Sequence, residues 1–265
     1  MTAHNVISTP DGVILVSDTA SYSLDGVIRD FMPKSYVNEG RRWGAVFTGS
    51  TVAGDFWREK MPDVSFDEAR RIIPEVMRRQ FAILSEEIGE SAHLGVSLAG
   101  WSDEDGGWTC CIIKSHGGAP RNFEPFTPYT GGGSISPNPL IGGVERPLTD
   151  FELGWNYGQL GYLETMRRVL IAQRRVDLVV TDGRKVPCAI GGQGEAVIIT
   201  SSGVKRFTLI DWKDEIGEPV EARVARRSAE PVDALLIPSR AERRRFDRHM
   251  GRVESKAAPA ERIAA

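Results

Sequence analysis

Short apolar runs separated by turn residues begin the chain and have the lengths of β-strands. The runs His4–Ser8 and Val13–Tyr22 flank Thr9–Gly12, which has proline at its second position and glycine at its fourth. That arrangement is typical of a type I turn joining a hairpin. Val27–Val37 and Trp43–Thr48 form a second strand-like pair around a glycine-containing turn. The pattern therefore predicts four short strands before any helix.

Helical periodicity follows this first group of strands. Ser65–Glu68 is a capping box, and apolar residues then recur with a 3.6-residue period up to a stop at Gly89. Pro74 lies inside this run and predicts a kink or a break. A shorter helix is predicted over Thr51–Lys60. Two helices thus follow the first strands.

Strands then return, and a second helical stretch separates them from the last strands. His93–Ala99 and Trp108–Lys114 predict another hairpin, and the Gly- and Pro-rich stretch Gly117–Pro147 reads as loop. A helix is predicted over Asp150–Arg175, before strands at Leu178–Val180, Ala196–Ile199 and Val204–Ile210. This order favours an α+β domain in which two sheets stack and helices cover their outer faces. It does not suit a doubly wound parallel sheet, where strands and helices alternate singly.

Composition places the chain among globular proteins with a basic tail. With 265 residues, 41% hydrophobic and 26% charged, residues 1–211 can form one packed domain. Residues 212–265 are a basic, arginine-rich extension, either a solvated tail or a contact surface for a partner subunit. A net charge of -3 gives no reason to expect nucleic acid as a partner. No apolar run has the roughly 18 residues of a membrane span, and no signal peptide is recognisable, so we expect a cytoplasmic protein without membrane contact.

Neither the cysteines nor the histidines predict a disulfide, a metal site or a cofactor. Of the three cysteines, Cys110 and Cys111 are adjacent and should point to opposite faces of a strand, so we expect reduced, buried thiols. The four histidines have no metal-ligand spacing with one another or with the cysteines.

Candidate chemistry lies at the amino terminus. Thr2 is small, so methionine aminopeptidase should remove Met1 and leave a threonine with a free α-amino group. An α-amino group with a pKa of about 7.7–8.0 can accept the proton of its own residue's hydroxyl. The predicted hairpin brings Asp18 within one residue of Thr2 across the ladder. Lys34, in the predicted strand Val27–Val37, is an unusual residue for an apolar strand interior and would supply a cation that Asp18 holds.

These positions carry a resemblance to the N-terminal threonine peptidases, which include proteasome β subunits and the peptidase subunit of the bacterial two-component ATP-dependent protease. In those proteins an acidic residue and a lysine follow the threonine at the intervals of Asp18 and Lys34. The chain is also similar over four longer segments, so the resemblance spans about Thr2 to Ile210: Val13–Asp18, Phe47–Asp55, Tyr129–Ser134 and Val197–Phe207.

The resemblance implies a four-layer αββα sandwich, the fold of the N-terminal nucleophile (Ntn) hydrolases, and a threonine-type endopeptidase. Thr2 would be the nucleophile, Asp18 and Lys34 would stabilise charge, and the Gly49 N–H would bind the oxyanion. It also implies a homo-oligomeric ring that takes a peptide or an unfolded protein as substrate, and it leaves open an ATPase partner.

The chain departs from the family pattern at the auxiliary residues. Gly132 stands where the family has a serine, which leaves Ser134 and Ser136 as substitutes. The family's auxiliary aspartate and second serine are missing near Pro187–Gly192. Asp182, a few residues earlier, is a candidate replacement. Two alternatives therefore stay open: a catalytically silent structural or assembly subunit, and a non-peptide acylase or amidase of the same superfamily.

Overall fold

The computed structural model describes residues 2–23, 26–49, 61–89, 92–116, 124–136, 157–158, 160–174, 178–179, 185–186 and 190–219. The predicted helix Thr51–Lys60, the candidate Asp182 and the extension from residue 220 onward lie outside these residues. The described residues include the helices α2 (Phe66–Ile88) and α4 (Tyr162–Gln173). The strands are β1 (His4–Thr9), β2 (Gly12–Asp18), β3 (Ala20–Tyr22), β4 (Ile28–Phe31), β5 (Ser35–Asn38), β6 (Trp43–Gly49), β7 (Leu94–Ser102), β8 (Gly107–Lys114), β9 (Tyr129–Gly131), β10 (Gly133–Ser136), β11 (Leu178–Val179), β12 (Lys185–Val186), β13 (Gln193–Thr200) and β14 (Gly203–Asp211).

The first sheet has five antiparallel strands in the order β10-β1-β2-β13-β14. The predicted hairpin is confirmed, since Thr9 pairs with Gly12 and only Pro10 and Asp11 form the turn. β2 ends at Asp18 rather than at Tyr22, because the chain leaves this sheet and starts a two-stranded sheet of β3 and β4. Asp18 therefore lies at the end of a central strand.

The second sheet has the order β5-β6-β7-β8-β9 and is also antiparallel. The prediction of one strand over Val27–Val37 was wrong, because β4 and β5 belong to different sheets. Pro33 lies between them and has no N–H for a ladder, which gives a physical reason for the break. Lys34 consequently lies in the connection before β5 and not in a strand interior.

The glycine run at residues 131–133 was predicted as loop and instead passes from one sheet to the other. Gly131 ends β9 opposite Cys110, and Gly133 starts β10 opposite Ile7. A Cβ on Gly133 would lie 2.8 Å from the Val6 carbonyl oxygen, so a side chain would disturb this close approach. Glycine thus permits the tight pairing of β10 with β1.

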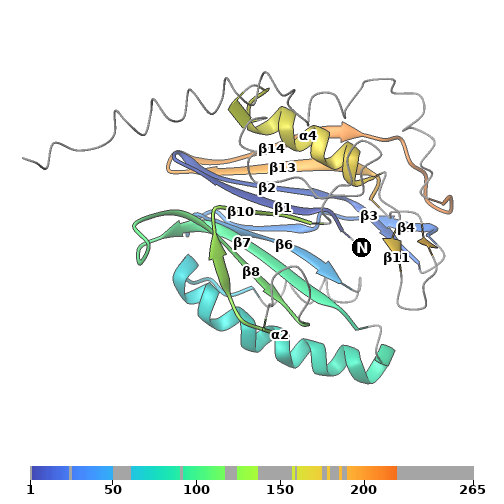
Figure 1. Cartoon of the computed structure of the whole chain (residues 1–265), viewed down its shortest axis with the longest axis horizontal. Coiled ribbons are helices and arrows are strands. Elements are labelled where there is room, and N and C mark those ends of the chain that lie inside the picture. Colours follow the sequence, from blue (N-terminus) through green and yellow to red (C-terminus); the bar gives the residue numbers. More distant parts are fainter. Residues whose placement is uncertain are drawn as a thin grey trace, which may run out of the picture.

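Three groups of buried apolar residues organise the described elements into an α+β fold. One group lies between α4 and the first sheet, a second between α2 and the second sheet, and a third contains residues of both sheets. Figure 1 shows the resulting order, with α4 on the outer face of the first sheet and α2 on the outer face of the second. The two sheets therefore pack face to face.

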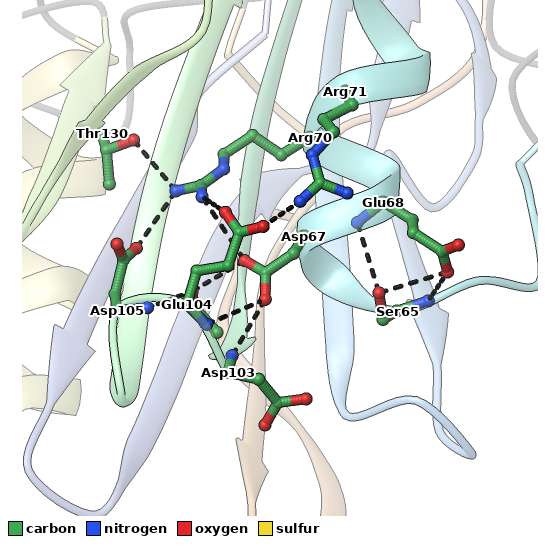
Figure 2. A network of polar contacts seen from close by, with 10 residues as sticks. Ser65, Asp67, Glu68, Arg70, Arg71, Asp103, Glu104, Asp105 and Thr130 are labelled. Atoms are coloured by element: carbon green, nitrogen blue, oxygen red, sulfur yellow. Dashed lines mark hydrogen bonds and ion pairs between the residues drawn. The ribbon is translucent and has the colours of Figure 1, made fainter.

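Helix α2 begins with the predicted capping box and ends at Gly89. Of the kink or break predicted at Pro74, the break is wrong, since the helix continues through this buried proline. Figure 2 shows how its first turn is fixed: Asp67 accepts the backbone N–H groups of Asp103 and Glu104 in the turn after β7, and Arg70 contacts Glu104. Asp67 also accepts the Ser102 hydroxyl at 2.7 Å. This polar network fastens α2 to the β7–β8 turn.

The packed part of the chain continues beyond β14. Trp212 is buried in the core beside α4, and Asp214 forms an ion pair with Arg174. Pro219 bridges to Val27. Among the described helices, none has the length and apolarity that crossing a membrane would require.

Candidate functional site

The core between the sheets changes from apolar to polar at one end. Val6, Leu15 and Val46 belong to the apolar part of this core. Two residues away on the same three strands lie His4, Ser17 and Thr48, respectively. Because side chains alternate along a strand, each polar residue shares a face with its apolar neighbour. His4, Ser17 and Thr48 are all buried. The polar end is the end at which Thr2 enters β1.

Asp18 is the centre of the polar contacts at this end. Its side chain is fully buried, and its Oδ1 accepts the backbone N–H of Ala3 at 2.9 Å. Its Oδ2 accepts the Lys34 Nζ at 2.9 Å and the Gly191 N–H at 3.2 Å. Hydrogen bonds to an ionised carboxylate are the stronger kind, and two of the three donors here are backbone groups of fixed position. Asp18 therefore ties the strand after Thr2 to Lys34.

Lys34 is held in place by both its side chain and its backbone. Its side chain is only 10% exposed and pairs with Asp18, while its carbonyl oxygen accepts the Phe47 N–H of β6. The structure thus brings Asp18 and Lys34 together, directly beside the backbone of the residue after Thr2. Thr2 itself is buried, with 5% of its surface exposed.

A second buried ion pair supports the turn that contacts Asp18. Arg174, at the end of α4, donates two hydrogen bonds to Asp214 and a third to the Ile190 carbonyl. Asp214 also accepts the Gly192 N–H at 2.7 Å. The Gly191 carbonyl accepts the backbone N–H groups of Thr19 and Ala20. Arg174 and Asp214 therefore fix the same turn that donates to Asp18.

Gly49 ends β6 beside β7, with φ at +140°. A Cβ at this position would lie 2.4 Å from the His93 carbonyl oxygen. Only glycine meets both conditions, since other residues rarely adopt this backbone conformation. The expected helix start after Gly49 lies outside the described residues.

Three of the four histidines gather near this site, although their spacing in the sequence gave no sign of it. His93 and His116 lie with their Nδ1 atoms 3.2 Å apart, and the Ser115 hydroxyl is 3.2 Å from the same His116 nitrogen. His4 lies on the inner face of β1, and Lys114 ends β8. The pairing of β7 with β8 accounts for the meeting of His93 and His116.

Burial keeps these histidines neutral. Burial and the charge of Lys114 lower the pKa of His4 to about 4, against the opposing effect of a hydrogen bond at the Thr2 backbone. Burial, followed by His116 and His4, lowers the pKa of His93 to about 3. Burial also lowers the pKa of Lys114. The environment beside Thr2 thus disfavours positive charge, which is the condition for an amine to act as a base near neutrality.

The auxiliary candidates are only partly placed. Ser134 and Ser136 lie on β10, where the backbone of Ser136 pairs with His4 and that of Ser134 with Val6. Ser134 is half-buried. Asp182 lies outside the described residues.

Two cysteines lie in the described part of the chain, and both are buried in the core. Cys110 and Cys111 are free and buried on opposite faces of β8, and burial raises the pKa of the Cys111 thiol to about 12. Across the described residues, no group of three or more histidine, cysteine or acidic side chains is arranged to hold a metal ion.

Besides the histidines, sequence reasoning missed Gly191, Arg174 and Asp214. They come from α4 and the strand ends far along the chain, so no local pattern links them to Asp18. The one sequence signal for these three residues was Arg174, a cation directly after a helix that has an apolar face.

Comparison with known proteins gives no family assignment. No family model matches the chain, and no curated protein matches it.

Proposed function

We propose that the chain is an N-terminal threonine hydrolase that cleaves peptide or amide bonds, similar to the proteasome-type peptidases. The observation that carries the proposal is the position of Asp18, which accepts both the N–H that follows Thr2 and the ammonium of Lys34. A carboxylate in this position orients the N-terminal residue and gives the Lys34 ammonium a partner of opposite charge. The α+β fold, with helices on the outer faces of two packed sheets, supports the four-layer αββα arrangement of that superfamily.

The proposed reaction begins when Met1 is removed. The α-amino group of Thr2 accepts the proton of the Thr2 hydroxyl, and Oγ1 attacks the substrate carbonyl carbon. The Gly49 N–H stabilises the oxyanion, and Lys34 stabilises the developing charge on Oγ1. The carbon–nitrogen bond then breaks, and the leaving amine takes the proton from the α-amino group. Water hydrolyses the resulting ester and restores the free threonine.

The proposal includes a closed ring of identical subunits around a chamber that admits a peptide or an unfolded protein. Closed symmetry is the usual outcome for homo-oligomers, and the resemblance at Thr2, Asp18 and Lys34 favours it here. Size-exclusion chromatography with light scattering should give a mass that is a multiple of 29.1 kDa, whereas a monomer rejects the ring.

The decisive experiment combines intact mass with covalent labelling. The protein made in cells should lack Met1, and a peptide carrying a threonine-directed electrophile should add once per chain. Thr2→Ser should keep the label and Thr2→Ala should lose it. Alanine and serine are also small, so Met1 is removed in both variants and the comparison concerns the hydroxyl alone.

The outcomes separate the proposal from a silent assembly subunit. Full retention of Met1, or labelling that persists in Thr2→Ala, refutes the catalytic proposal. A ring that forms with Met1 retained supports the silent subunit instead. Labelling of Thr2 by small acyl electrophiles, without turnover of any peptide, supports a non-peptide acylase.

A further inference from the structure

A pocket of about 390 Å³ lies next to the Asp18 site. Its lining includes the immediate chain neighbours of the three residues that meet there: Thr19 follows Asp18, Pro33 precedes Lys34 and Gly192 follows Gly191. Figure 1 shows β3 and β4 at the same end of the sheets as the N-terminus. The volume falls within the range of small-ligand pockets, roughly 300–1,000 Å³. A group bound here would therefore lie beside the residues proposed to carry the reaction.

The charges that line the pocket are unevenly compensated. Asp214 pairs with Arg174, and Asp211 pairs with Lys213 at 2.5 Å. Glu195 is half-buried on β13, and within the described residues no hydrogen bond or ion pair engages its carboxylate. Because its acidic neighbours are already neutralised, Glu195 is the charge that a ligand would meet. A half-buried carboxylate without a partner favours a cationic ligand.

The other wall of the pocket is apolar. Phe31, Met32 and Pro33 line it, and Phe31 is 37% exposed. An exposed aromatic ring beside a carboxylate suits a ligand with a cationic head and an apolar stem, since the ring face also attracts a cation. The β13–β14 ladder changes register between Gly194 and Glu195, an irregularity of the kind that re-aims a side chain at a site.

We infer that this pocket binds an arginine or lysine side chain of a peptide substrate, with the cationic head on Glu195 and the stem against Phe31 and Met32. The inference rests on the proposed function, because it makes the pocket a subsite next to the scissile bond. It names the substrate class as peptides with a basic residue near the cleavage point. Glu195 is then a specificity-determining residue and not a catalytic one.

Binding tests this assignment without relying on catalysis. The full chain carrying Thr2→Ala is titrated with two labelled, acetylated and amidated pentapeptides that have four alanines and either a central arginine or its neutral isostere citrulline. Fluorescence anisotropy should show that the arginine peptide binds roughly tenfold more tightly. Glu195→Gln should abolish that preference. Glu195→Lys should make the arginine peptide bind more weakly than the citrulline peptide. Glu215→Gln removes a carboxylate from an exposed position outside the pocket, and it should keep the preference.

Three results would contradict the inferred binding of a basic side chain in this pocket. Equal binding of the two peptides, binding of neither at millimolar concentration, or a preference that survives Glu195→Gln overturns the inference. Circular dichroism of Glu195→Gln, matched to the parent, shows that a lost preference is not lost folding. Retention of Met1 would refute the proposed hydrolase yet leave the arginine preference intact, so the two failures are distinguishable.

Discussion

Replacing Asp18 by asparagine tests whether the contacts at the amino terminus are as important as their geometry suggests. The Asp18 side chain is fully buried and accepts three donors, one of them the ammonium of Lys34, whose side chain is 10% exposed. The asparagine side chain would offer one oxygen where the carboxylate offers two, and its NH₂ group would face a donor. Removing one partner of a buried pair leaves an uncompensated charge, which costs about 3–5 kcal/mol. That is a large share of the roughly 5–15 kcal/mol by which a domain is stable.

Urea unfolding followed by circular dichroism measures this cost. With a slope of about 2 kcal/mol per molar urea, Asp18→Asn should lower the midpoint by roughly 2 M. Asp18→Asn combined with Lys34→Met removes both charges and should recover part of the loss, since no buried ammonium is left alone. Glu75→Gln breaks two ion pairs, with Arg78 and Arg79, in which every side chain is more than half exposed, and it should leave the midpoint unchanged. A midpoint for Asp18→Asn within error of the parent would refute the reasoning.

Three further predictions concern the surroundings of this site. Burial and Lys114 lower the pKa of His4 to about 4, so the unfolded chain binds a proton at this position before the folded chain does as the pH falls. The contribution of neutral His4 to the free energy of unfolding should therefore be complete above about pH 6.5 and decline toward pH 4. His4→Gln should flatten that decline in urea titrations. Gly49→Ala forces a Cβ to within 2.4 Å of a backbone oxygen at a positive φ, so its melting temperature should fall; an unchanged value would contradict the geometry. Asp214→Asn breaks the buried pair with Arg174, and it should both lower the melting temperature and slow labelling of Thr2 by the electrophile. Normal labelling in a destabilised Asp214→Asn would limit that pair to a structural role.

Local patterns in the sequence predicted the elements that depend on neighbouring residues. The first hairpin, the capping box at Ser65 and the stop at Gly89 are all set by side chains within a few positions of one another. The strand predicted over Val27–Val37 failed because strand propensity on both sides of Pro33 hid a change of sheet. The glycine run at residues 131–133 was predicted as loop because composition alone does not reveal its structural role. That role is to let β10 approach β1 closely.

The candidate site was predictable only where the hairpin sets the geometry. Asp18 follows from the register of β1 and β2, since pairing of His4 with Ser17 brings Ala3 beside Asp18. Gly191 comes from a distant part of the chain, and its contact with Asp18 depends on how β13 joins β2. Contacts of this kind are set by tertiary packing, for which a single sequence carries no local signal.

The polar end of the inter-sheet core is itself an argument for function. Apolar residues would stabilise this end as they do the other, where Val6 and Leu15 pack against the facing sheet. Instead the His4 Nδ1 is buried there without a hydrogen-bond partner among the described residues. An unsatisfied buried polar group costs about 1–3 kcal/mol. At this end His4, Ser17 and Thr48 occupy buried positions that apolar side chains fill further along the same strands, and this is the end that carries Thr2 and the residues proposed for the reaction.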